Sequence, residues 1–339
     1  MKSFYYNSLS DKEIFLYNEL ILGFKNLNES IEVDFEENTN DFNSENIYLI
    51  FQDIKDSFPE LYYLNNYSVE IYWFQIKFFP EYIYNDLQII ELNRYLEIIS
   101  DKIISSIKAE QSDYEKAIIL HDYLKENIEY DYEALNSDCK TGFENSYTII
   151  GALIKNKCVC LGFSLAMKFL CNKIDLDCQI ITGLVDSSKT QYKGLHAWNI
   201  IYMDGYYHHV DVTWDNQYAD DSEIPNYAYF GLDDKTISAD HTWDRKSYPE
   251  ITENPYNYFI INKCLITSKS QLEKFILDNL KNKKISFLFK VKEGTLSDSE
   301  IPECLENTIF SSTNNYQAES YNTIWIPTQM IYLIKIEYK

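Results

Sequence analysis

The sequence predicts an α+β fold, built from helices and antiparallel strands. Capping-box patterns that begin at Ser10 and at Ser112 precede stretches with apolar residues at every third or fourth position, so both predict helices. Near the middle of the chain, Asp204-Gly205 separates two apolar stretches, which predicts an antiparallel hairpin. Hydrophobic residues make up 45% of the 339 residues, so the chain can bury a core.

The chain divides into three predicted parts. We interpret residues 1–110 as a mainly helical N-terminal region with a short hairpin, residues 111–249 as the core, and residues 250–339 as a small α/β C-terminal domain. The sequence has no internal repeat and no linker rich in Gly and Ser. We therefore expect the three parts to pack against one another.

Periodicity and helix breakers predict the individual elements. Alternating apolar residues from Tyr67 to Phe79 predict one long strand or a hairpin, which Pro80 is expected to end. In the first two parts we expect helices at about 10–24, 45–58, 86–109, 112–128 and 146–154, and strands at 31–35, 179–184, 195–203 and 206–212. In the last part we expect a helix at 268–279 and strands at 258–261, 285–291, 321–326 and 330–338.

The acidic charge balance restricts the partners of the chain. With a net charge of −23, the chain repels phosphate backbones and anionic lipid surfaces, so we expect no nucleic-acid partner and interpret the charge as a source of solubility. No apolar run reaches the roughly 18 residues of a membrane span. Residues 1–6 lack the apolar segment of a signal peptide. We expect a cytoplasmic protein, or a secreted or cell-surface protein if a leader has been removed.

The number and spacing of the cysteines favour reduced thiols. The chain has seven cysteines at irregular spacing, and a chain of this size does not require disulfides. In a secreted protein, three disulfides and one free thiol would also fit. Cys158 and Cys160 resemble half of a zinc site, but no second pair has zinc spacing, so we expect no metal and no other cofactor. The cysteines are Cys139, Cys158, Cys160, Cys171, Cys178, Cys264 and Cys304.

Cys160 is the candidate nucleophile, because it lies where a helix is expected to begin. Phe163 and Met167 follow it at helical spacing. The thiolate is the reactive form of cysteine, and both a helix N-terminus and a neighbouring imidazolium lower the pKa of a thiol. The backbone N–H groups of Cys160, Leu161 and Gly162 could hold an oxyanion. Gly162 would also let a substrate backbone come close.

Hairpin geometry selects His196 and Asp211 as partners of this thiol. A two-residue turn at 204–205 places Trp198 opposite Asp211, which makes His196 the diagonal neighbour of Asp211 on the same face. Diagonal residues lie roughly 7–8 Å apart at the backbone, within reach of their side chains. Asp211 can then accept a hydrogen bond from one ring nitrogen while the other faces Cys160. A one-residue slip would put the two side chains on opposite faces.

The other histidines have weaker claims to a functional role. His208 and His209 are adjacent on a strand and point to opposite faces, so they cannot share one metal. His209 shares the face of Asp211 and either lines the site with Trp198 or packs in the core, and packing is the favoured interpretation. His121 lies among apolar neighbours and is interpreted as a core residue.

A charged cluster follows the hairpin. Asp240 and His241 are adjacent, and Arg245 lies four residues further on. Such a cluster is either structural or a cap on the cleft. The sequence does not decide between these two interpretations.

Three motifs in this order resemble the transglutaminase-like superfamily of papain-type thiol enzymes, in its bacterial form. Members have Gly-Val-Cys-x-Gly-Tyr-Ala, then His-Ala-Trp-Asn, then an Asp before Thr-Trp-Asp. The resemblance covers about residues 112–245, and the C-terminal part has no recognised counterpart. The matching stretches are Val159-Cys160-Leu161-Gly162-Phe163-Ser164, His196-Ala197-Trp198-Asn199 and Asp211-Val212-Thr213-Trp214-Asp215.

The resemblance implies a papain-like core, in which a helix carrying Cys160 packs on an antiparallel sheet carrying His196 and Asp211. It implies that these three residues form a catalytic triad for acyl transfer at an amide bond of a peptide or protein substrate, through a thioester. Hydrolysis by a cysteine peptidase or amidase is favoured. Transfer to an amine by a protein-glutamine gamma-glutamyltransferase is the first alternative, and a non-catalytic peptide- or glycan-binding module is the second. The oligomeric state stays open.

The sequence departs from this family at Cys158, where members have glycine. A second thiol beside the nucleophile could form a strained disulfide or a redox lock, or could simply replace a tolerant glycine. We favour the last interpretation.

Overall fold

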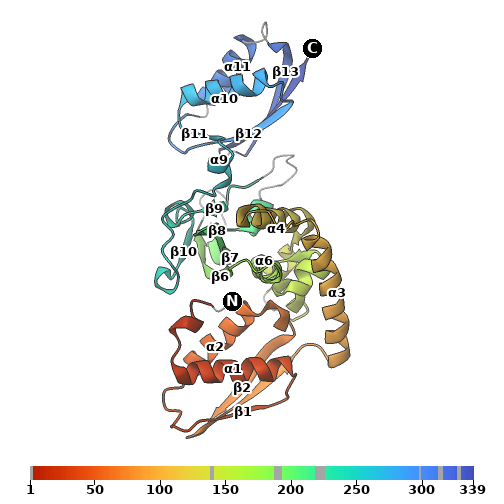
Figure 1. The fold of residues 1–339 in the computed structure, drawn as a ribbon, viewed down its shortest axis with the longest axis vertical. Coiled ribbons are helices and arrows are strands. Elements are labelled where there is room, and N and C mark those ends of the chain that lie inside the picture. Colours follow the sequence, from red (N-terminus) through yellow and green to blue (C-terminus); the bar gives the residue numbers. More distant parts are fainter. Residues whose placement is uncertain are drawn as a thin grey trace.

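The computed structural model describes residues 3–137, 141–186, 193–217, 226–297, 299–311, 316–326 and 330–339. Within these ranges, three units follow one another along the long axis of the molecule, and each has its own sheet (Figure 1). The fold is α+β, as the sequence predicts. The division at residues 110 and 249 remains a proposal. Among the helices of these ranges, none combines the length and the apolar character needed to cross a membrane.

The first unit packs helices α1 (Asp11–Lys25) and α2 (Ser44–Ser57) against a three-stranded sheet. The rings of Phe24, Phe51 and Phe78 meet between the helices and the sheet, and all three are buried. The predicted helices are confirmed here. The sheet order is β1 (Ile31–Asp34), β3 (Gln75–Tyr82) and β2 (Leu64–Ile71), and the unit also contains the short helices η1 (Tyr6–Ser8) and η2 (Pro59–Leu61).

The aromatic stretch around residue 70 is a hairpin of β2 and β3 rather than one long strand. The expectation that Pro80 ends the strand is wrong, because Pro80 lies inside β3 and pairs with Tyr67. Strand β1 pairs with β3 only up to Phe78. At Pro80, β3 therefore has one free side, where a missing N–H group costs no ladder hydrogen bond.

The second unit is built around an antiparallel sheet with helix α6 (Cys160–Lys173) packed on it. Residues 162–171 of α6 are all buried, as expected for a helix enclosed on every side. Asn199 Nδ2 donates to the Ser164 carbonyl over 3.1 Å and ties the sheet to α6. The strand order is β10 (His241–Trp243), β6 (Cys178–Asp186), β7 (Lys193–Met203), β8 (Tyr206–Val210) and β9 (Phe230–Leu232).

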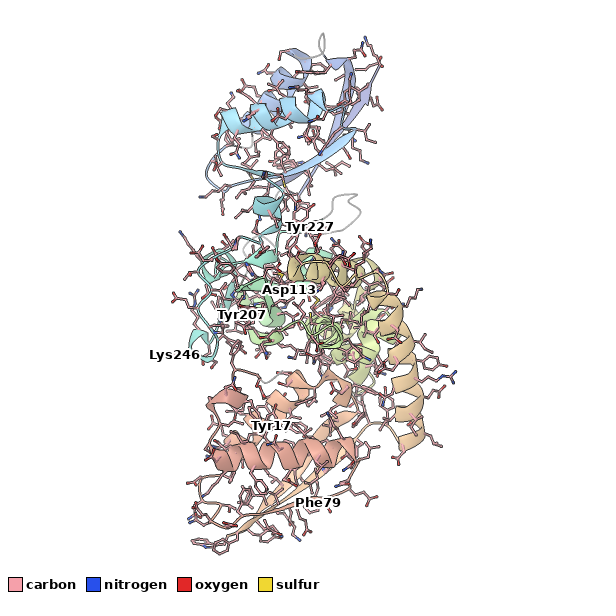
Figure 2. The ribbon with its side chains drawn as sticks, viewed as in Figure 1. Tyr17, Phe79, Asp113, Tyr207, Tyr227 and Lys246 are labelled. Carbon is pink, nitrogen blue, oxygen red and sulfur yellow. The ribbon has the colours of Figure 1, made fainter. Side chains whose placement is uncertain are left out.

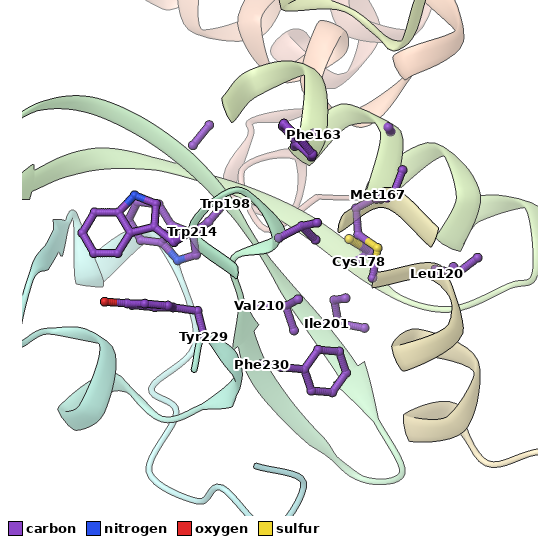
Figure 3. Packing of buried hydrophobic residues seen from close by; sticks show 14 of the residues in the cluster. Leu120, Phe163, Met167, Cys178, Trp198, Ile201, Val210, Trp214, Tyr229 and Phe230 are labelled. Atoms are coloured by element: carbon purple, nitrogen blue, oxygen red, sulfur yellow. The ribbon is translucent and has the colours of Figure 1, made fainter. Parts of the chain in front are cut away.

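Further helices surround this sheet, and α3 (Asp86–Ile104) lies along the first and second units (Figure 1). The predicted capping box at Ser112 is confirmed at the start of α4 (Asp113–Asn127). Buried side chains from α4, α6 and the sheet form one cluster, among them Leu120, Phe163, Met167, Ile201, Val210 and Phe230 (Figure 3). The shorter elements are β4 (Glu129–Tyr130), α5 (Tyr132–Leu135), η3 (Glu144–Tyr147), η4 (Ile150–Ile154), β5 (Lys157–Cys158), α7 (Val212–Gln217), α8 (Asp234–Ile237) and η5 (Arg245–Ser247).

The central hairpin has the register that the sequence predicts. Met203 pairs with Tyr206, and the pairing continues to Asn199 opposite Val210. Asp204 and Gly205 have φ angles of 47° and 107°, the two left-handed positions of a type I′ turn. The strand ends one pair short of Asp211, which turns out of the sheet.

Within the described residues, the third unit has a four-stranded sheet and three helices. The strand expected at 258–261 is wrong, because this stretch forms the short helix α9 (Tyr258–Ile261). Asn257 Oδ1 accepts from the N–H groups of Phe259 and Ile260, and this local cap outweighs the β-branched composition. The remaining elements are β11 (Leu265–Ile266), α10 (Lys269–Lys281), β12 (Ser286–Val291), α11 (Glu300–Ser311), β13 (Ala318–Ile326) and β14 (Ile331–Tyr338). Helix α11 lies in a stretch where no element was expected.

Candidate active site

Cys160 is the first residue of α6, and Val159 occupies the N-cap position. No side chain caps this helix end, so the positive end of the helix dipole faces the thiol. Leu161 beside it is partly exposed. Of the six cysteines within the described residues, Cys160 is the one that is not buried. Cys139 lies outside the described residues.

Gly162 is required by packing inside the protein. A Cβ atom at this position would lie 2.6 Å from Cys158 Cβ and 2.8 Å from the Ser146 carbonyl oxygen. Gly162 is buried, so the idea that it lets a substrate approach is wrong. Cys158 is a free and fully buried thiol, and burial raises its pKa well above the usual value.

His196 on β7 connects the thiol to a carboxylate. Its Nε2 atom donates to Asp211 Oδ2 over 2.7 Å, so the predicted hydrogen bond between the two is confirmed. Burial lowers the pKa of His196. The charge and hydrogen bond of Asp211, together with a hydrogen bond to the Cys160 side chain, outweigh burial and raise this pKa to about 10. The imidazole is therefore protonated at neutral pH, as a thiolate partner requires.

Asp211 reaches this position because it starts a helix at the end of a strand. Its backbone N–H donates to the Tyr229 carbonyl over 3.0 Å, and its Oδ1 accepts from the Trp214 N–H over 3.1 Å. The second contact is a typical N-cap bond for α7. The same side chain thus ends β8, begins α7 and leaves Oδ2 free to face His196.

Asp211 is ionised despite complete burial. Burial acts to raise its pKa, but the charge of His196 and the hydrogen bonds from His196 and His241 lower it far below the usual range. The side chains of Asp211 and His196 are 1% and 2% exposed, so water does not screen this pair. The charges of the pair are therefore held in a fixed arrangement.

Trp198 and His209 lie behind His196 rather than on an open surface. Both are fully buried, and Trp198 Nε1 donates to His209 Nδ1 over 3.0 Å. His209 Nε2 in turn donates to Asp234 Oδ1 over 2.8 Å. The Trp198 ring stacks on the His196 ring with centroids 5.9 Å apart. Both residues support the imidazole from within the protein.

His121 and His208 have structural positions. His121 is fully buried, with Nε2 3.0 Å from Asp215 Oδ2, so its interpretation as a core residue is confirmed. His208 donates from Nδ1 to the Tyr206 carbonyl over 3.1 Å. Among the described atoms, Nε2 of His208 has no hydrogen-bond partner, and burial lowers the pKa of this histidine to about 4.

His241 is the residue whose position the sequence analysis left undecided. Its Nε2 atom lies 3.1 Å from Asp211 Oδ2, and its Nδ1 atom lies 2.7 Å from Asp240 Oδ1. Arg245 instead stacks over the Trp243 ring, 4.6 Å from its centroid. The contact depends on the pairing of β10 with β6 across more than fifty residues of sequence, which no local pattern indicates.

Three of these side chains present metal-ligating atoms close together. One atom from each of His196, Asp211 and His241 lies within 4.8 Å of the others. In the described structure these atoms already form hydrogen bonds with one another, because Asp211 Oδ2 accepts from both imidazoles. Hydrogen bonding therefore accounts for the cluster without a metal.

Comparison with known proteins places this site in a matched region. Residues 101–212 match the model of the transglutaminase-like superfamily. The kyphoscoliosis peptidase of Mus musculus is 25% identical over 163 residues, which cover 45% of this chain. The match covers 23% of that peptidase, so the chain corresponds to less than a quarter of the length of this relative.

Two solved structures show a weaker likeness. The crystal structure of a TGase has a TM-score of 0.32 and 15% identity, and the match covers 54% of this chain and 50% of the other. A candidate cysteine protease from Cytophaga hutchinsonii has a TM-score of 0.28 and 19% identity, over 42% of this chain and 54% of the other. At these scores neither structure adds anything about the reaction.

Proposed function

We propose that this protein transfers acyl groups from amide bonds, because residues 101–212 match the model of the transglutaminase-like superfamily. Cys160 is the nucleophile, His196 is the acid and base, and Asp211 orients the imidazole. One observation carries the proposal. A thiol at an uncapped helix start is hydrogen-bonded to an imidazole that a buried carboxylate holds from its other side.

The proposed reaction begins from a thiolate–imidazolium pair. The Cys160 sulfur attacks the amide carbonyl, and backbone N–H groups at the start of α6 stabilise the oxyanion. His196 gives its proton to the leaving amine, and a thioester remains on Cys160. A second nucleophile then attacks the thioester while neutral His196 takes its proton, so the sulfur leaves as a thiolate, the acyl group is released and the thiolate–imidazolium pair is restored.

Hydrolysis is the favoured second step. The His196 side chain is only 2% exposed, so we infer that a nucleophile must be small to reach the thioester beside this imidazole. Water meets this condition more easily than a lysine side chain on a second protein. The mouse relative is also named as a peptidase. We therefore propose a cysteine peptidase or amidase, with a peptide or protein as the substrate.

A peptide-cleavage experiment tests the choice of reaction. The full chain is incubated with a glutamine-containing peptide library and a labelled primary amine, and the products are analysed by mass spectrometry. New peptide termini, or glutamate in place of glutamine without label, support hydrolysis. Incorporation of the amine overturns hydrolysis in favour of transfer. A Cys160→Ala variant must abolish either product, and a Cys264→Ala variant, which changes a buried thiol, must leave it.

Alkylation tests whether Cys160 is activated at all. We expect iodoacetamide to modify Cys160 near pH 7 at least about tenfold faster than a free model thiol, because a thiolate is the reacting species. A rate equal to that of the free thiol would overturn the enzyme proposal. It would favour a non-catalytic binding module in its place.

A further inference from the structure

A second imidazole shares the carboxylate that orients His196. Asp211 Oδ2 accepts from His196 Nε2 at 2.7 Å and from His241 Nε2 at 3.1 Å. We propose that His241 is a positioning residue, which holds the Asp211 carboxylate in line with His196. The role rests on the proposed function, in which His196 serves Cys160. His241 itself touches neither the thiol nor, as proposed, the substrate.

The carboxylate needs this second donor because it is fully buried. An ionised carboxylate offers about four acceptor sites. In the described structure Trp214 supplies one donor to Oδ1, and the two imidazoles supply donors to Oδ2. Asp211 is 0% exposed, so water does not replace a lost donor. Without His241, Oδ2 would keep His196 as its single donor among the described residues.

His241 is itself fixed by a second carboxylate and a phenol. Its Nδ1 atom lies 2.7 Å from Asp240 Oδ1, and the Tyr229 hydroxyl donates to Asp240 Oδ2 over 2.6 Å. The Asp240 carbonyl accepts from the Asp186 N–H over 2.9 Å, which anchors this outer pair to the end of β6. A continuous chain of hydrogen bonds thus leads from Tyr229 through Asp240, His241 and Asp211 to His196.

Aromatic rings prevent the His241 ring from turning away. The rings of Trp214 and Trp198 lie 4.5 Å and 4.9 Å from it, between centroids, and the Tyr229 ring lies 5.7 Å from it. These rings come from α7, β7 and the turn before β9, and Figure 3 shows them gathered at one end of the buried cluster. His241 is 0% exposed. Its position is therefore set by packing as well as by hydrogen bonds.

The ionisable groups around His241 indicate what its loss would change. His196 faces it from β7, Asp211 from the end of β8, His209 from β8 itself, and Asp240 and Tyr229 from the outer side. The hydrogen bond and charge of His241 are among the causes that keep the pKa of Asp211 low. Without the hydrogen bond and charge of His241, we expect the pKa of Asp211 to rise. Protonation of Asp211 would then remove its ionic hydrogen bond with His196.

Three variants of the full chain test the role. His241→Leu removes the donor, and His241→Gln keeps an N–H group at a similar distance from the backbone. His208→Leu is the matched control, because His208 is another fully buried histidine of the same sheet, and among the described residues it is hydrogen-bonded to the Tyr206 carbonyl rather than to Asp211. The readouts are the low-field proton resonance of the His196–Asp211 hydrogen bond and the pH profile of Cys160 alkylation by iodoacetamide.

We expect His241→Leu to lose or broaden this resonance and to move the acid limb of the alkylation profile to higher pH. The rate at pH 6 should fall about tenfold or more, the lower end of the effect seen when a hydrogen-bond partner behind a functional histidine is removed. His241→Gln should restore most of both signals, and His208→Leu should change neither. If His241→Leu does not fold, Tyr229→Phe, which removes one hydrogen bond of the chain, should shift the profile in the same direction by less.

An unchanged resonance and an unchanged profile in His241→Leu, or in Tyr229→Phe where the first does not fold, overturn the positioning role. The resonance belongs to the folded protein and does not depend on turnover. A slowly alkylated wild-type Cys160 would therefore overturn the proposed function, while the resonance would still decide the role of His241.

Discussion

At the scale of single residues, the charge of Asp211 determines the state of His196. Burial alone lowers the pKa of this imidazole, and the carboxylate reverses the effect. Asp211→Asn keeps the shape of the side chain but removes the charge, so the imidazole should become neutral at pH 7. We expect alkylation of Cys160 at pH 7 to fall by at least about 10²-fold, since loss of the orienting charge in a serine triad costs about 10⁴ in kcat.

A matched control for this variant is Asp186→Asn. Asp186 is a carboxylate on the neighbouring strand β6, and its side chain is 67% exposed in an ion pair with Lys193. Exposed pairs of this kind contribute little. An equal loss of rate in both variants would show that the effect does not come from the His196 pair.

Gly162 allows a test of the packing around the nucleophile. Gly162→Ala places a Cβ atom 2.6 Å from Cys158 Cβ and should destabilise the protein by about 1–3 kcal/mol, the usual cost of overpacking. Urea unfolding measures this loss. Changing Cys158 to Gly should recover part of it, and the Ser146 carbonyl at 2.8 Å should keep the rest. If the double variant is no more stable than Gly162→Ala, the steric clash at the first turn of α6 does not come from Cys158.

At the scale of elements, Asp204 connects the central hairpin to α4. It occupies a left-handed position of the turn, and its carboxylate oxygens accept from the N–H groups of Asp113 and Tyr114, each over 3.1 Å. Asp204→Ala loses both bonds and tolerates the left-handed conformation poorly, whereas Asp204→Asn tolerates it and keeps an acceptor. We expect the Ala variant to be about 1–3 kcal/mol less stable than the Asn variant in thermal or urea unfolding. Equal stability would show that the turn does not support α4.

Elements with local signals could be predicted from the sequence, and elements set by distant contacts could not. The capping boxes at Ser10 and Ser112 and the hairpin at 204–205 depend on neighbouring residues, and the structure confirms them. Pro80 was misjudged because its tolerance depends on where β1 stops pairing. The strand expected at 258–261 is wrong, because the side chain of Asn257 caps a helix that contains these four residues.

The candidate site follows the same distinction. His196 and Asp211 lie on one hairpin, so a turn of known geometry was enough to bring them together. His241 arrives through a strand that pairs with β6, and Gly162 is explained by a thiol and a carbonyl that fold back on it. Neither contact has a sequence period or a spacing that would reveal it.

At the scale of the whole molecule, the junction of the second and third units lies beyond residue 250. The Tyr258 ring stacks on Tyr227 with centroids 3.9 Å apart, and Tyr227 lies at this junction (Figure 2). Asn257 Nδ2 donates to the Phe230 carbonyl over 3.4 Å, and the Asp234 N–H donates to the Ile251 carbonyl over 2.9 Å. We expect a chain ending at residue 263 to melt at a higher temperature than one ending at residue 249. Equal melting temperatures would show that residues 250–263 add nothing to the stability of the second unit.

The stability of the molecule should fall on both sides of neutral pH. The pKa of His196 rises from 6.5 to about 10 on folding, so its contribution is complete below pH 6.5 and is lost as the pH rises towards 10. The pKa of His208 falls from 6.5 to about 4, so its neutral form favours folding above pH 6.5 and this contribution is lost as the pH falls towards 4. The melting temperature measured from pH 4 to 10 should flatten on the acid side in His208→Leu. An unchanged acid side would contradict the assignment to His208.

Because every imidazole is buried, reagents in solution have little access to the histidines of the folded protein. All five histidines are at most 5% exposed. A mild acylating reagent that seeks imidazoles should therefore react slowly with the intact protein and rapidly once it unfolds. The rate of this labelling would therefore report unfolding of the second unit, because all five histidines lie within this unit.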